Sequence, residues 1–499
     1  MDAHKDSQPL QQPTNRESVQ RTFVEKYSYD DVLLQPGYAD FLPADTDVGV
    51  DLAPGIHLNV PVLSAAMDTV TEQELAIALA LEGGMGIIHR NMTPKEQAAQ
   101  VAAVKRHLNW IIENPITVEP TQTIGQVREI VQSNGISGLP VVHEDRVVGI
   151  ITSRDLRFAP DNGALVQDVM TADPVVQVGK PTEAKAQEKF NEFRIEKLPI
   201  VDEDGRLLGL VTVKDMEKHR IFPRAATDAS GRLLVGAAIA PVDIDTRLDL
   251  LVEARADLIV VDTAHGDSQN VAEAVRRVKA RYPNLVVIGG NVATSAGTKR
   301  LIDAGADIVK VGVGPGSICT TRIVAGIGVP QLSAVLDAVD VAAAAGVPVI
   351  ADGGIKFSGD ITKALAAGAH AVMVGSLFAG LKEAPGKEFL YEGRIFKAYR
   401  GMGSVGAMKK GGGERYNVAE GEEPVPEGVE GRVPYKGELR HYLHQLVMGL
   451  RKGMGYCGCR TLTQLRQYRN FVKITSAGLA ESHVHDVSLV RQPANYSRS

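Results

Sequence analysis

The chain has 499 residues, of which 44% are hydrophobic and 23% charged, and this ordinary usage excludes a chain that is disordered throughout. Its formal net charge of −6 argues against a general nucleic-acid binder, which would present a basic face. Three cysteines are too few for a disulfide framework and fit a reducing compartment. The polar N-terminal stretch has no apolar segment of the kind a secretory signal needs. We therefore expect a cytoplasmic protein with no membrane contact and no stable nucleic-acid complex.

Residues 1–26 are rich in Gln, Asp, Ser and Pro and predict a flexible tail. From Tyr27 onward, short apolar runs alternate with helical patterns, which predicts an α/β fold: a (β/α)8 TIM barrel built from residues 27–109 and 221–499. A doubly wound sheet is the alternative, but no G-x-G-x-x-G opens a helix after the first strand. The predicted barrel strands are Val60–Ala65, Met85–His89, Leu233–Ala238, Leu258–Asp262, Val286–Gly290, Ile308–Gly312, Val347–Ala351 and Ala371–Gly375.

Residues 110–220 interrupt this pattern with an internal repeat, whose copies span about 112–165 and about 168–220. A barrel loop tolerates such an insert because loop-closure entropy grows slowly with length. The repeat therefore predicts one paired α+β module inserted into the barrel. Two segments carry the match: Ile136–Val142 returns as Ile195–Val201, and Gly149–Asp155 returns as Gly209–Asp215.

The insert resembles a tandem pair of cystathionine-β-synthase (CBS) domains. In that family a Thr-x-x-Asp pattern after the last strand of each repeat can hold the ribose of a nucleotide. The resemblance implies a regulatory purine-nucleotide site on Thr152 and Asp155 in the first repeat and on Thr212 and Asp215 in the second. The alternative is that each Asp only caps the helix that follows it.

The loop Gly314–Arg322 carries the strongest chemical signal in the barrel. It follows the predicted strand Ile308–Gly312 and so belongs to the carboxyl-terminal mouth, where barrel enzymes keep their active sites. Its Cys319 lies in a loop bordered by glycines, a context that argues against a small buried apolar role for the thiol. A thiolate is a strong nucleophile, and loop amides can lower its pKa. Cys319 is therefore the candidate catalytic residue.

Other predicted strands end in residues suited to a nucleotide at the same mouth. Gly353-Gly354 and Gly375-Ser376 offer backbone amides that can bind phosphate oxygens. Asp352 can accept hydrogen bonds from a ribose. The stretch Tyr399–Ser404 adds further amides and an apolar wall for a base.

These segments, with Glu414-Arg415-Tyr416 and Pro426–Val433, resemble the inosine-5′-monophosphate (IMP) dehydrogenase family from about Tyr27 to Tyr496. That family oxidises IMP to xanthosine 5′-monophosphate with NAD⁺, the committed step toward guanine nucleotides. The resemblance implies that Cys319 adds to C2 of the purine. Hydride then passes to NAD⁺ and leaves a covalent thioimidate, which water hydrolyses.

The resemblance also assigns the remaining site residues. Arg415 with Tyr416 would activate the water, Thr321 would orient it, and Glu427 would serve an alternative proton route. IMP would be held by Ser64, Met67, Ser317, Asp352, Gly354, Gly375, Ser376, Tyr399, Gly401, Met402, Gly403 and Glu427. NAD would be held by Asp262, Thr263, Ala264, His265, Asn291, Gly312 and Gly314, with Pro36 and Tyr456 reaching it across a subunit boundary.

Residues of about 405–436 are rich in Gly, Glu and Pro and predict a mobile flap that lets Arg415 enter after NADH leaves. Members of the family bind a monovalent cation, usually K⁺. Here its ligands would be Gly314, Gly316 and Cys319, with Glu481, Ser482 and His483 of a neighbouring subunit. The resemblance implies a homotetramer, which in this family can pair into an octamer.

Two rival functions remain. GMP reductase shares the barrel, the cysteine loop and the phosphate loops, but it usually lacks the CBS pair and the Arg-Tyr flap. A catalytically silent nucleotide sensor built on the CBS pair is the second rival. Intact Cys319, Thr321 and Arg415 argue against it.

Overall fold

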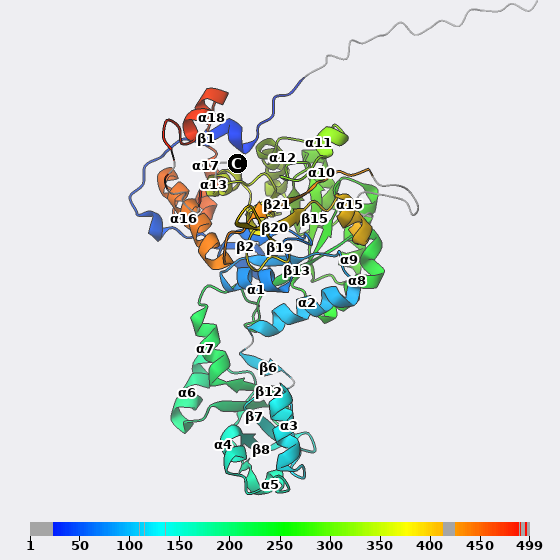
Figure 1. The fold of residues 1–499 in the computed structure, drawn as a ribbon, viewed down its shortest axis with the longest axis vertical. Helices are drawn as coiled ribbons and strands as arrows, with labels where there is room; N and C mark the ends of the chain where they lie inside the picture. The colour runs from blue at the N-terminus through cyan, green and yellow to red at the C-terminus, as the bar shows by residue number, and fades with distance from the viewer. Residues whose placement is uncertain are drawn as a thin grey trace, which may run out of the picture.

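The computed structural model describes residues 23–108, 110–113, 115–134, 136–412, 425–488, 490 and 495–496. Its centre is a closed barrel of eight parallel strands, each followed along the chain by a helix (Figure 1). This confirms the predicted (β/α)8 fold. In barrel order the strands are β13 (Val235–Ile239), β14 (Leu258–Asp262), β15 (Val286–Val292), β16 (Ile308–Val311), β17 (Val349–Asp352), β18 (Ala371–Val374), β4 (Val62–Ser64) and β5 (Met85–Ile88).

The barrel strands are buried on both faces, between the barrel interior and the surrounding helices. Every residue of β14, for example, is buried. A strand in this position is an unbroken apolar run rather than an alternating one, which is why its sequence marks it clearly. The helices that follow the strands are α1 (Gln73–Leu81), α2 (Pro94–His107), α8 (Ile244–Glu253), α9 (Gln269–Arg281), α10 (Ser295–Asp303), α12 (Gln331–Ala344), α13 (Ser358–Ala366) and α14 (Ser376–Ala379).

Each of these helices buries one stripe against the strands. In α9, Val271, Ala274, Val275 and Val278 recur at the spacing that places them on one face, and all four are buried. Helix α2 begins at a capping box in which the Thr93 hydroxyl accepts from the Glu96 amide and the Glu96 carboxylate accepts from the Thr93 amide. Among the described residues, no helix is long and apolar enough to span a lipid bilayer.

Beyond the last barrel strand, the chain forms an antiparallel sheet of β19 (Glu388–Tyr391), β20 (Arg394–Arg400) and β21 (Glu430–Pro434). The expected flap, 405–436, therefore ends in a strand, which pairs Gly431 with Tyr399. Residues 413–424, which include Arg415 and Tyr416, lie outside the described residues. The C-terminal region consists of α16 (Leu439–Cys457), α17 (Leu462–Tyr468), β22 (Phe471–Lys473), which pairs with β1 (Val32–Leu34), and α18 (Ser476–Ser482).

The segment between β6 (Ile111–Glu113) and α7 (Val213–Ile221) extends away from the barrel and forms two small sheets (Figure 1). Each sheet lies beside its own cluster of buried apolar side chains, separate from the barrel core. The other elements of this segment are α3 (Ile124–Asn134), β7 (Gly138–His143), β8 (Arg146–Thr152), α4 (Ser153–Phe158), α5 (Val166–Val169), β9 (Thr171–Ala172), β10 (Gln177–Val178), α6 (Glu183–Phe193), β11 (Lys197–Val201) and β12 (Leu207–Thr212).

The two sheets exchange strands. Strand β6 leads into the first repeat but pairs with β12 of the second. Strand β9, its counterpart in the second repeat, pairs with β8 of the first. Arg146 and Arg206, which occupy equivalent positions in the two repeats, form an antiparallel bridge between the sheets. The repeats are therefore interlocked. If the chain were divided near residue 166, between the two repeats, each sheet would lack one of its strands.

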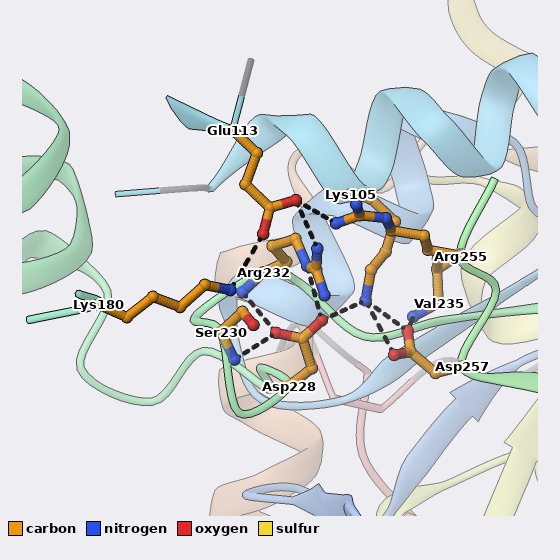
Figure 2. A network of polar contacts seen from close by, with 9 residues as sticks. All are labelled: Lys105, Glu113, Lys180, Asp228, Ser230, Arg232, Val235, Arg255 and Asp257. Carbon is orange, nitrogen blue, oxygen red and sulfur yellow. Dashed lines mark hydrogen bonds and ion pairs between the residues drawn. The ribbon is translucent and has the colours of Figure 1, made fainter. Parts of the chain in front are cut away.

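A polar network joins this segment to the foot of the barrel (Figure 2). The buried Lys105 ammonium lies between Asp228, at 3.0 Å, and Asp257, at 2.8 Å. Arg232 contacts Asp228 at 2.9 Å and Glu113 of β6 at 3.4 Å. Arg255 and Lys180 also contact Glu113, so one carboxylate ties the first strand of the insert to two barrel loops.

Candidate active site

A cavity opens where the barrel strands end, and most of the predicted ligand-binding residues line it. Its wall is formed by loops after β4, β14, β15, β16, β17 and β18, together with residues of and after β20. The predicted residues in the wall are Met67, Asp262, Thr263, Ala264, Asn291, Gly312, Gly314, Gly316, Ser317, Cys319, Thr321, Asp352, Gly354, Gly375, Ser376, Tyr399, Gly401, Met402 and Glu427.

Cys319 lies at this wall with a free, half-buried thiol. Its thiol donates to the Thr321 hydroxyl at 3.1 Å, and that hydroxyl donates to the Glu427 carboxylate at 2.7 Å. The three side chains form a continuous path for a proton that leaves the sulfur.

Backbone pairing explains why Glu427 reaches a loop so far away in the sequence. Cys319 and Gly428 form an antiparallel bridge. The Thr320 amide donates to the Glu427 carbonyl at 3.0 Å, and the Val429 amide donates to the Ile318 carbonyl at 3.0 Å. These backbone contacts thus hold residues 427–429, the returning arm of the expected flap, against the cysteine loop.

A buried cluster of charges forms the floor of the cavity beside the cysteine loop. Lys310 on β16 lies 3.0 Å from Asp262 and 2.6 Å from Asp352, and it contacts the side-chain oxygen of Asn291. The Asn291 amide donates to Asp352 at 2.9 Å. Lys310 is a site residue that was not predicted from the sequence. The available signal was a single charged residue inside the apolar run Ile308–Val311, because such a residue must find buried partners.

Residues predicted to meet a phosphate converge at another part of the wall. Gly353 and Gly354 turn the chain after β17 with φ of +93° and +77°, a conformation that other residues rarely adopt. The Tyr399 ring is buried, which raises the pKa of its hydroxyl to about 12, although a hydrogen bond with Ser317 partly opposes that effect. A Cβ on Gly375 would lie 3.4 Å from the same hydroxyl. The phenol therefore stays neutral and can donate to an anion.

Several residues predicted to bind IMP or NAD are not among the side chains and loops that line this cavity. Ser64 is fully buried and accepts a 2.8 Å hydrogen bond from Thr71, so it supports the wall from behind. The Gly403 carbonyl accepts from the Glu427 amide at 3.0 Å, and this contact holds the arm. His265 is exposed and follows the wall residue Ala264 in the chain. Arg415 and Tyr416 fall in 413–424, outside the described residues.

The residues expected to act across a subunit boundary do not line this cavity. Pro36 and Tyr456 are both exposed and are brought together by a 2.8 Å bond from the Gly37 amide to the Tyr456 carbonyl. Glu481 and Ser482 end α18, and the His483 ring lies 6.0 Å from that of Phe357. Their roles in a neighbouring subunit stay predictions. Among the described side chains, no group of three or more His, Cys, Asp or Glu is arranged to hold a metal.

In the insert, the expected nucleotide residues make helix-capping contacts. The Thr152 hydroxyl and amide both donate to Asp155 at 2.7 Å. The Thr212 hydroxyl donates to Asp215 at 2.5 Å. These are the contacts that the capping alternative predicts, and the ribose site stays a prediction.

Comparison with known proteins gives consistent results. A family model described as "IMP dehydrogenase / GMP reductase domain" matches residues 26–485. Inosine-5′-monophosphate dehydrogenases of Halalkalibacterium halodurans and Bacillus subtilis are 53% and 51% identical, each over 95% of this chain and 98% of the relative. A solved structure of Trypanosoma brucei GMP reductase, a cysteine-to-alanine variant with guanosine 5′-monophosphate, matches with a TM-score of 0.83 and 41% identity, covering 94% of this chain and 99% of that one.

The last match corrects one argument from the sequence. Residues 110–220 make up about a fifth of the chain, and a match over 94% leaves too little unmatched to omit them. A GMP reductase can thus carry a counterpart of the insert. The insert therefore does not distinguish the two activities, and the distinction falls on the flap and the residues around Cys319.

Proposed function

The chain belongs to the IMP dehydrogenase and GMP reductase family, and on that premise we propose that it oxidises IMP to xanthosine 5′-monophosphate with NAD⁺ in guanine nucleotide synthesis. The observation that carries the proposal is the hydrogen-bonded series Cys319, Thr321 and Glu427 at the cavity wall. It sets a nucleophile, a hydroxyl and a proton acceptor beside one another. That arrangement suits a covalent intermediate that is subsequently hydrolysed.

In the first half-reaction, the Cys319 proton passes through Thr321 to Glu427, and the sulfur bonds to C2 of the purine. The hydride at C2 then leaves, and a thioimidate joins the purine to Cys319. NAD⁺, when bound, supplies the hydride acceptor. Asp262 and Asn291 beside the cysteine loop provide a carboxylate and an amide, a donor and acceptor set that fits a nicotinamide riboside.

In the second half-reaction, a water oxygen bonds to C2, the bond from C2 to sulfur breaks, and the thiol is restored. Thr321 touches both Cys319 and Glu427, so it can orient the water. Glu427 releases the proton from Cys319 to solvent after the first half-reaction, receives a proton from the water in the second, and returns that proton to the departing sulfur. The resemblance assigns the main activating role to Arg415 and Tyr416. Free arginine stays protonated at neutral pH, so this role requires a shielded site.

The remaining IMP contacts are assigned to residues that line the cavity. The phosphate would meet Ser317, Gly354, Ser376 and the neutral Tyr399, and the ribose would meet Asp352. The K⁺ site, the homotetramer, its pairing into an octamer and the purine-nucleotide site of the CBS-like insert belong to the same proposal.

The deciding experiment incubates the full chain with IMP and NAD⁺ and follows NADH absorbance, with GMP and NADPH as the control for the reductase. Cys319→Ala should abolish turnover and leave IMP binding largely intact, since the phosphate and ribose contacts do not use the thiol. Oxidation of NADPH by GMP without NADH production from IMP would assign the reductase. Near-normal NADH production by the variant would refute the nucleophile.

A further inference from the structure

Lys310 is a buried cation whose ammonium contacts two carboxylates of the cavity wall, Asp262 and Asp352. Its side chain is 2% exposed, and its ammonium contacts Asp262 of β14, Asn291 of β15 and Asp352 of β17. Burying an ammonium and two carboxylates is costly unless they are paired in good geometry. The position of the ammonium therefore determines where both carboxylates can lie.

The oxygens of Asp352 are used unequally. Its Oδ2 accepts from Lys310 at 2.6 Å and from Asn291 at 2.9 Å. Its Oδ1 makes no hydrogen bond with the described residues, and the side chain remains 18% exposed at the cavity wall. Because Lys310 and Asn291 fix one oxygen, the carboxylate is held in a single orientation at the cavity wall.

We propose that Lys310 is a positioning residue that makes the nucleotide site selective for a ribose over a 2′-deoxyribose. The inference rests on the proposed function, in which Asp352 accepts from the ribose hydroxyls. A carboxylate free to rotate can turn toward water and loses little when one hydroxyl is absent. A carboxylate fixed by a charge-assisted hydrogen bond is left with an unpaired buried oxygen, which penalises the deoxynucleotide.

The test measures equilibrium binding of IMP and 2′-deoxy-IMP to the intact chain, with no turnover required. We expect the unaltered protein to prefer IMP by about tenfold or more. In Lys310→Met, which removes the ammonium and keeps the stem, the preference should fall to about twofold, mainly through weaker IMP binding. Lys310→Gln retains a neutral donor, so its preference for IMP should lie between that of the unaltered protein and that of Lys310→Met. If the Met variant does not fold, the preference of the Gln variant tests the proposal.

Lys397→Met is the matched control. Lys397 is another lysine with 2% side-chain exposure, but its ammonium donates to backbone carbonyls, including those of Leu381 at 2.8 Å and Ala384 at 2.6 Å. Its loss should change both affinities by the same factor and leave the preference intact.

The possible failures are distinguishable. If the unaltered protein binds both nucleotides equally, the ribose contact of the proposed function fails and the role of Lys310 fails with it. If the unaltered protein discriminates and the Lys310 variants keep the same ratio, only the positioning role is overturned.

Discussion

Thr321 donates a 2.7 Å hydrogen bond to Glu427 across 106 positions of sequence. This contact joins the loop that carries the candidate nucleophile to the arm that returns from 413–424. Any movement of that arm is therefore transmitted to the residue beside the sulfur.

Thr321→Val should lower kcat by about 10²-fold or more, because it breaks the proton path while preserving side-chain volume. IMP affinity should change less than a few-fold, since Thr321 is not expected to hold the nucleotide. Steady-state NADH production and direct IMP binding measure the two quantities. Thr320→Val, one position away and outside the series, is the control and should keep most of kcat. Equal losses of kcat in both variants would show that valine disturbs the loop in general and would contradict the proton path.

Arg415→Ala should separate the two half-reactions. Hydride transfer needs Cys319, IMP and NAD⁺, whereas hydrolysis needs a proton acceptor for water, whose loss costs about 10²–10⁴-fold. Rapid mixing should show a burst of NADH close to one per site, followed by slow turnover, with the adduct on Cys319 detected by mass spectrometry. A variant that binds IMP but gives no burst would assign Arg415 to an earlier step.

Much of the fold could be predicted because its signals are local. Strands such as β14 are buried on both faces, and the loops that follow them carry glycines where the backbone turns sharply. Most site residues could be placed for the same reason, since a strand end in a barrel fixes which mouth it faces. Cys319 and Asp352 were found in this way.

The missed features depend on partners far away in the sequence. Lys310 could be noticed as a charge in an apolar strand, but its contacts with Asp262 and Asp352 arise only when the barrel closes. The exchange of β6 and β9 was also missed, because a repeat shows that two units are alike and not which unit completes which sheet.

Lys105→Met should lower the free energy of unfolding by about 3–5 kcal/mol. The substitution leaves Asp228 and Asp257 without the ammonium between them, and the pKa of Asp257 is already raised by burial despite that charge. Thermal or denaturant unfolding measures the effect. Lys299→Met, at an exposed pair with Asp303, should cost about 0.5 kcal/mol or less. A Lys105 effect as small as that of Lys299 would contradict the network.

His370 should make the protein less stable in acid. Burial, reinforced by the charge of Arg466, lowers the pKa of His370 to about 4. An unfolded chain takes up this proton near pH 6.5, so the stability from the neutral ring is present above that pH and is lost as pH falls toward 4. The loss between about pH 7 and about pH 5 is on the order of 1–2 kcal/mol.

Melting temperatures at the two pH values provide the measurement. His370→Gln should lose less on acidification than the unaltered chain, and His485→Gln, at an exposed position, should behave like the unaltered chain. A drop in His370→Gln as large as in the unaltered chain would contradict the assignment.

The exchange of β6 and β9 constrains the order in which the two small sheets can form while the chain is being synthesised. The first small sheet stays open until Thr171 and Ala172 of β9 have been synthesised, and β6 waits for β12, which ends at Thr212. A nascent chain that stalls between these points exposes an unpaired edge, the surface on which chains associate wrongly. Removing one repeat alone would leave a strand of the other repeat without its partner. A truncation of this insert therefore has to remove both repeats, β6 included, and rejoin the barrel near Leu108 and Ile221.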